Sequence, residues 1–209
     1  MRIRTTIATT ALLLAALTAC GGSDNGDSIA ADPQPADAPT AADTQADAQA
    51  EAPKSLGLGD PAETIGDGGT GVLRITPDSV VFAEEAHGEP AANGVFVVIA
   101  WKAEATTGAA ADSLAPITGG GWSWIAPDGE MIGWDSGNST TVTLDRFQNS
   151  DPVQPGTYQW RNEVFDLTPE QAEGGTLLYV DGNEAAFRWD MPTTDTGPNI
   201  TDLRSEVED

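Results

Sequence analysis

The clearest pattern in this sequence is an alternation of apolar and polar residues that begins near residue 58 and recurs up to residue 189. Residues 95–101 give the strongest signal, because both alternating sets of positions are apolar. Apolar side chains on both faces are typical of a central strand that is covered on both sides. Other strand-like segments cover residues 72–75, 79–82, 122–125, 131–132, 140–144, 158–165, 177–180 and 186–189.

Turn-forming residues separate these segments. Pro77-Asp78 stands between two of them, and Pro127-Asp128-Gly129 between two more. Asp181-Gly182-Asn183 joins the last two segments and predicts a closing hairpin. Residues 168–172 predict one short helical turn, with Thr168 as its N-cap and proline at the first helical position.

The spacing of the strands predicts an all-β fold for residues 58–192. About seven or eight strands drawn from these short segments, without a long amphipathic helix, favour an immunoglobulin-like antiparallel β-sandwich. Trp101 is expected to be the buried tryptophan of its core. The chain holds one cysteine, at position 20, so this domain must be stable without a disulfide.

Both flanks of this domain have a different composition. Residues 20–57 are rich in Ala, Asp and Pro and almost free of large apolar side chains, which predicts a disordered tether. Residues 193–209 are acidic and are expected to form a disordered tail.

Residues 1–19 have the features of a secretory signal peptide. Arg2 and Arg4 are followed by an uncharged apolar stretch over residues 7–19. A stretch of 13 residues is too short to span a bilayer, which takes about 20 apolar residues as helix. The stretch ends in Leu17-Thr18-Ala19-Cys20, which resembles the lipobox of bacterial lipoproteins.

That resemblance implies that Cys20 receives a diacylglycerol and becomes the mature N-terminus. Two acyl chains suffice for stable membrane attachment. The expected localisation is therefore extracytoplasmic, on the outer face of the cell membrane, with the membrane as a partner through the lipid on Cys20.

Residues 58–192 also resemble a telokin-like, immunoglobulin-like domain of unknown function found in cell-surface lipoproteins of Gram-positive bacteria. The resemblance rests on Leu58-Gly59-Asp60-Pro61, Phe96-Val97-Val98-Ile99, Trp124-Ile125-Ala126-Pro127-Asp128-Gly129, Val153-Gln154-Pro155-Gly156, Val164-Phe165-Asp166-Leu167 and the last two strands. It implies a fold and a location rather than an activity.

The charge of the chain excludes one class of partner. Thirty-three acidic residues stand against nine basic ones, which gives a formal net charge of −24. Loss of residues 1–19 would make it more negative, because Arg2 and Arg4 would leave. Nucleic-acid binding depends on neutralising phosphates, so no nucleic acid is expected as a partner.

The sequence predicts no catalytic residue, cofactor or metal. His87 is the only histidine and lies in a polar loop, and no Gly-x-Ser-x-Gly motif accompanies it. A zinc site would need more Cys or His residues. Residues 135–139 and 181–184 carry oxygen ligands that calcium could use, but the same residue types are favoured in tight turns.

Three tryptophans leave two functions open. Trp122 and Trp124 share one face of a strand, and Trp134 follows closely. If that face is the core, the indoles are packing residues. If it is solvent, they form a flat platform for a ligand. The first hypothesis is a non-catalytic envelope module that binds a protein or cell-wall partner through its loops or an edge strand. The alternative is a carbohydrate-binding domain that holds a glycan on Trp122 and Trp124.

Overall fold

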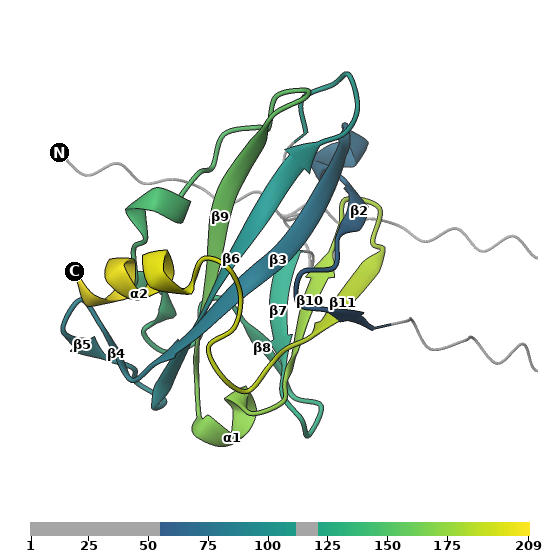
Figure 1. Cartoon of the computed structure of the whole chain (residues 1–209). Helices are drawn as coiled ribbons and strands as arrows, with labels where there is room; N and C mark the ends of the chain where they lie inside the picture. Colours follow the sequence, from purple (N-terminus) through teal and green to yellow (C-terminus); the bar gives the residue numbers. More distant parts are fainter. Residues whose placement is uncertain (1–54, 112–120) are drawn as a thin grey trace, which may run out of the picture. The chain divides into compact units, whose positions relative to one another are not determined.

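A computed structural model of the chain describes residues 55–111 and 121–209 (Figure 1). The predicted signal peptide, the lipobox with Cys20 and residues 20–54 of the predicted tether lie outside the described residues. Within the described residues, no helix combines the length and the apolar character that crossing a membrane requires.

Most of the described chain is built from two β-sheets. The first has five strands in the order β1-β11-β10-β7-β8. Its strands are β1 (Leu56–Gly57), β7 (Gly121–Ile125), β8 (Met131–Gly133), β10 (Thr176–Val180) and β11 (Ala186–Asp190). All its pairings are antiparallel except that of β1 with β11, which is parallel.

The second sheet has four antiparallel strands in the order β2-β3-β6-β9. Its strands are β2 (Ala62–Ile65), β3 (Val72–Ala83), β6 (Val95–Ala105) and β9 (Tyr158–Leu167). A small hairpin of β4 (Glu85–Ala86) and β5 (Glu89–Pro90) projects from the end of β3. The remaining elements are the short helices η1 (Asp67–Gly69), η2 (Ser139–Thr141), η3 (Asp145–Phe147), α1 (Pro169–Ala172) and α2 (Ile200–Glu208).

The two sheets pack face to face, as the predicted all-β sandwich requires. Figure 1 shows β3, β6 and β9 in one layer and β7, β10 and β11 in the other. The core between them takes side chains from both sheets, among them Ile99 and Phe165 from one and Trp124 and Leu177 from the other.

Strand β6 is the central strand that the sequence predicts, with β3 on one side and β9 on the other. Val97 and Ile99 point into the core between the sheets. Phe96 and Val98 point the opposite way, into a second apolar cluster on the outer face of the sheet. Both faces of this strand are therefore buried.

Two predictions about individual strands are wrong. The segments at 72–75 and 79–82 form one continuous strand, β3, because Pro77-Asp78 makes a bulge in the ladder instead of a turn. The extra residue shifts the alternation, so that Ile75 before it and Val80 after it both face the core. Residues 140–144, although β-branched, partner no strand and begin in the short helix η2.

The predicted hairpin and helical turn are confirmed. Strands β10 and β11 pair across the turn at Asp181. Helix α1 begins after Thr168, whose side chain accepts from the Gln171 N–H, while the Gln171 side chain accepts from the Thr168 N–H. This reciprocal capping box fixes the turn.

The predicted disordered tail is wrong, and the fold extends past both predicted boundaries. Leu56 and Gly57 pair with Trp189 and Asp190. Residues 193–199 lead into α2, which covers the outer face of the four-stranded sheet. Ile200, Leu203 and Val207, at spacings of three and four, pack in the second apolar cluster. Because acidic residues surround this apolar stripe, the composition of residues 193–209 alone does not reveal it.

Leu203 provides the test of this docking. Leu203 is fully buried, so Leu203→Ala should destabilise the chain by about 2–5 kcal/mol, the usual cost of truncating a buried leucine. The exposed neighbour Ser205 is the control, and Ser205→Ala should change the free energy of unfolding by less than about 0.5 kcal/mol. Urea denaturation measures both. Equal values for the two variants would mean that α2 does not pack on the sheet.

Candidate functional site

Of the two interpretations that the sequence leaves open for Trp122 and Trp124, the structure supports the core and not a surface platform. Trp122 is 6% exposed and Trp124 is fully buried, since both indoles point between the sheets. The Trp122 ring lies 5.0 Å from the ring of Trp101 and 4.7 Å from that of Tyr179. The Trp124 Nε1–H donates to the carbonyl of Gln171 at 2.8 Å.

Trp134, unlike Trp122 and Trp124, lies on the surface. It follows the edge strand β8 and is 56% exposed, as is the neighbouring Met131 at 67%. A single exposed indole cannot form the pair of stacking surfaces that the hypothesis needs. The interpretation of Trp122 and Trp124 as a carbohydrate platform is therefore wrong, and they are core residues.

The two acidic turns considered for calcium are held by main-chain donors. Asp181 is buried, and its carboxylate accepts from the N–H groups of Ile65, Asn183 and Ala185 at 2.9 Å each. These bonds link the β10–β11 turn to β2. Turn chemistry accounts for this carboxylate.

The segment at residues 135–139 is organised around Asp166, a residue that the sequence did not single out. The Asp166 carboxylate is buried and accepts from the N–H groups of Ala92, Asn93 and Asn138 at 2.6–2.8 Å. Gly137 has a positive φ of 50°, and a Cβ there would overlap that carboxylate. Among the described residues, no three His, Cys, Asp or Glu side chains are grouped as metal ligands.

His87 lies in the exposed tip of the β4–β5 hairpin, as expected of a loop histidine. Its Nε2 is 2.9 Å from the carbonyl oxygen of Thr143, and its main-chain N–H donates to the carbonyl of Val207. The imidazole thus contacts a main-chain acceptor instead of a nucleophile.

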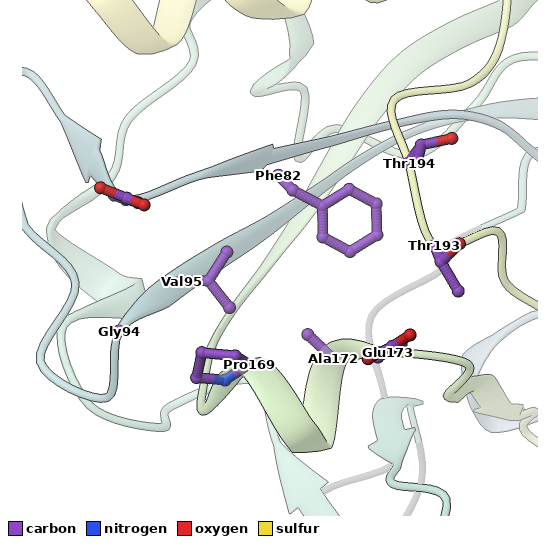
Figure 2. A pocket seen from close by; sticks show the side chains of 9 residues that line it. Phe82, Gly94, Val95, Pro169, Ala172, Glu173, Thr193 and Thr194 are labelled. Carbon is purple, nitrogen blue, oxygen red and sulfur yellow. The ribbon is translucent and has the colours of Figure 1, made fainter.

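A pocket of about 490 Å³ opens at the end of the sandwich next to α1. Phe82 at the end of β3 and Val95 at the start of β6 face inward and form the outermost layer of the core. Figure 2 shows the Phe82 ring between Val95 on one side and Thr193 on the other, with Ala172 across from it. The pocket is lined by Phe82, Glu84, Gly94, Val95, Pro169, Ala172, Glu173, Thr193 and Thr194.

Helix α1 supplies one wall of this pocket. The capping box at Thr168 sets the turn, which places Pro169, Ala172 and Glu173 against the pocket. Gly94 approaches this wall closely. It has a φ of 123°, and a Cβ on it would lie 3.3 Å from the Cδ of Pro169. A side chain at position 94 would therefore strain the backbone and crowd the wall.

The opposite wall is the C-terminal strap, by which we mean residues 193–199 between β11 and α2. The strap is fastened to β3, because Thr196 and Val80 exchange main-chain hydrogen bonds. The Asp195 carboxylate accepts from the Phe82 N–H at 3.0 Å and from the Arg204 Nε at 2.8 Å. Arg204 also donates to the Phe82 carbonyl. Arg204 of α2 therefore helps to hold this wall of the pocket in place.

The charge of the pocket comes from two carboxylates on different elements. Glu84 and Glu173 are both exposed, and neither side chain has an ion-pair or hydrogen-bond partner among the described residues. No basic residue lines the pocket. Arg204, which reaches the backbone of Phe82, is already paired with Asp195 at 2.6 Å.

An acid with a raised pKa, Glu163, lies away from the pocket. Glu163 is half-buried on β9 and, by strand alternation, shares the inward face with Arg161 and Phe165. Burial raises the pKa of the Glu163 carboxyl to about 8, although the neighbouring Arg161 lowers it. The Arg161 guanidinium lies 5.7 Å from the centre of the Trp101 ring.

Comparisons with known proteins give one distant likeness. No protein-family model matches the chain, and no curated protein matches it. A solved structure of a conserved hypothetical protein from Bacillus anthracis is similar with a TM-score of 0.42 and 14% identity. The match covers 65% of this chain and 95% of that one.

The sequence signalled some of the pocket and missed the rest. Thr168 as N-cap and the proline after it predicted the short helix α1, which forms one wall. The second wall was missed because residues 193–194 lie in a segment whose composition resembles a disordered tail. Glu84 and Glu173 are two of 33 acids, and nothing local distinguishes them.

Trp124 and Trp134 give a matched test of core and surface. Trp124→Ala should cost about 3–5 kcal/mol of unfolding free energy, because it empties a fully buried site and leaves the Gln171 carbonyl without its donor. Trp134→Ala should cost less than about 1 kcal/mol. Chemical denaturation of both variants is the measurement, and similar costs would contradict the assignment of Trp124 to the core.

Glu163 should make the stability of the protein depend on pH. Because its pKa rises from 4.5 to about 8 on folding, the folded chain holds a proton that the unfolded chain releases between these values. Its contribution is complete below pH 4.5 and is lost as the pH rises through about 8. Glu163→Gln keeps the neutral form and should be more stable than the parent chain at high pH.

The measurement is the urea midpoint of both chains from about pH 5 to about pH 9. The two curves should converge at the acid end and separate as the pH rises. Glu170→Gln, which neutralises an exposed acid, serves as the control and should follow the parent curve. If the Glu163→Gln curve runs parallel to that of the parent chain throughout, then Glu163 is ionised in the folded protein.

Proposed function

We propose that this protein is a lipid-anchored, extracytoplasmic binding module of the bacterial envelope, with an immunoglobulin-like sandwich that receives its ligand in the pocket at the α1 end. The pocket carries the proposal of binding. It combines an apolar floor, Phe82 and Val95, with exposed carboxylates that have no partner among the described residues. A mostly apolar hollow with a few polar groups at its rim is typical of a ligand site.

The lipid anchor is supported by the N-terminal sequence. A basic start, a short uncharged apolar stretch and Leu17-Thr18-Ala19-Cys20 occur in the order that a lipobox requires. Cys20 is the only cysteine of the chain. The resemblance of the domain to telokin-like domains of cell-surface lipoproteins agrees with this location.

The immunoglobulin-like assignment is supported by the core. Two antiparallel layers pack around Trp101, which lies on the central strand β6 and touches Trp122 of the facing sheet. A buried tryptophan on a central strand is a hallmark of immunoglobulin domains.

A binding role without catalysis is supported by the way polar groups are used. The buried carboxylates of Asp166 and Asp181 accept from main-chain N–H groups. His87 contacts a carbonyl oxygen. These side chains hold loops in place.

Cys20 is the residue that tests the anchor. Cells that express the full chain and are fed an alkyne-bearing palmitate should incorporate the label into the parent protein and not into Cys20→Ala. The variant should also leave the membrane fraction, since the acyl chains are what hold the protein there. Thr18→Ala, which keeps the thiol, is the matched control and should remain labelled. Labelling of Cys20→Ala at the parent level would refute the lipoprotein assignment.

A further inference from the structure

We infer that the pocket binds a basic side chain, that of a lysine or an arginine, presented by an extended segment of a partner protein. This inference rests on the proposed binding function and specifies the chemistry of the ligand. It combines three features of the pocket, namely its floor, its charge and its free main-chain groups.

The floor suits the stem of a long basic side chain. Phe82, Val95, Pro169 and Ala172 supply apolar surface on three sides (Figure 2). The methylene groups of lysine or arginine bury well against such surface while the charged end stays near water. The face of an aromatic ring such as Phe82 also attracts a cation.

The charge of the pocket selects a cation. Glu84 and Glu173 line the pocket from different elements, one after β3 and one after α1, and neither is neutralised by a base among the described residues. An anionic ligand would be repelled by both, and by a chain whose formal charge is −24. A neutral apolar ligand would leave both carboxylates unpaired.

The arrangement favours an organic cation over a metal ion. The two carboxylates come from separate elements and flank apolar side chains. Among the described residues, no group of three acidic or histidine side chains converges there or elsewhere. Calcium takes six to eight oxygen ligands, which this lining does not provide.

The strap adds a feature that a polypeptide can use. Thr193 is exposed, and the structure gives neither its N–H nor its C=O a partner among the described residues. Thr193 lies beside Phe82 at the mouth of the pocket (Figure 2). An extended segment can pair its own backbone with these two groups while its side chain enters the pocket, as in recognition by strand addition.

The experiment is a titration of the full chain carrying Cys20→Ala, which keeps the lipid off, followed by NMR. The ligands are a blocked pentapeptide with lysine at the centre of four glycines, the same peptide with norleucine in place of lysine, and free butylamine. Norleucine matches the lysine stem without the charge, and butylamine matches the side chain without the backbone. The signals to follow are the methyl groups of Val95 and Ala172 and the amides of Thr193 and Thr194.

The lysine peptide should shift these signals with a dissociation constant of about 1 mM, a reasonable value for one anchoring side chain. Norleucine peptide and butylamine should each bind at least about tenfold more weakly. The double variant Glu84→Gln, Glu173→Gln should lose at least about tenfold for the lysine peptide. The double variant Glu89→Gln, Glu170→Gln changes the same number of exposed acids outside the pocket and should bind like the parent chain.

Each contrary result overturns a stated part. Equal binding of the norleucine and lysine peptides would overturn the cationic ligand and leave the pocket as a binding site. Equal binding of butylamine would overturn the polypeptide partner. Absence of pocket shifts with every ligand would overturn the whole inference, while the acyl-labelling result decides independently whether the protein is a lipoprotein. An effect of the control double variant as large as that of the pocket variant would show that bulk charge, and not this pocket, attracts the peptide.

Discussion

The fold depends on covering both faces of strand β6. One set of its side chains meets the other sheet, and the alternate set, Phe96 and Val98, would face water if nothing lay over it. Each large apolar side chain left exposed would cost about 1.5–3 kcal/mol relative to burial. No disulfide is available to compensate, since the chain has one cysteine at position 20. The outer face must therefore be covered by the chain itself, and α2 provides much of that cover.

The need for this cover explains where the pocket is. Strand β11 ends in the five-stranded sheet, whereas α2 has to lie on the far face of the four-stranded sheet. The chain between them passes along the edge of the four-stranded sheet, where Thr196 pairs with Val80 of β3, and this crossing is the strap. Its route past the Phe82 ring leaves a hollow that the core does not fill. The segment that leads to the outer cover of β6 thus also forms one wall of the pocket.

The sandwich could be predicted from the sequence, but the docking of α2 on its outer face could not. Residues 95–101 predicted a central strand because consecutive apolar residues place apolar side chains on both faces of a strand. The capping box at Thr168 and the turn at Asp181 were predictable for a similar reason, since their partners lie within a few residues. The sequence predicted a turn at Pro77-Asp78 because the same residue types occur in turns and in bulges. Only the pairing of β3 with the distant strand β6 shows that this one is a bulge. The segment at 140–144 has strand propensity but no neighbouring strand edge to pair with.

The candidate site shows where local reasoning fails. Trp122 and Trp124 were correctly placed on one face of a strand, but which face meets the other sheet is decided by the whole topology. The docking of α2 could not be predicted locally, because Ile200, Leu203 and Val207 are only three apolar positions among acids. Their burial depends on contacts with the cluster that contains Phe96 and Val98, about a hundred residues earlier. The pocket residues come from β3, the start of β6, α1 and the strap, so no single stretch of sequence contains the site.

The parallel pairing of β1 with β11 has a mechanical consequence for a protein held at its N-terminal end. A pull transmitted through residue 55 is applied first to β1, which contributes only Leu56 and Gly57 to the sheet. Behind it, the Trp189 indole donates to the Asp60 carbonyl at 2.9 Å, and the next resistance is the β2–β3 ladder. Force should therefore peel the entry strand away while the sandwich, the strap and the pocket at the α1 end stay folded. The short strand β1 should therefore detach under tension before the pocket is disturbed.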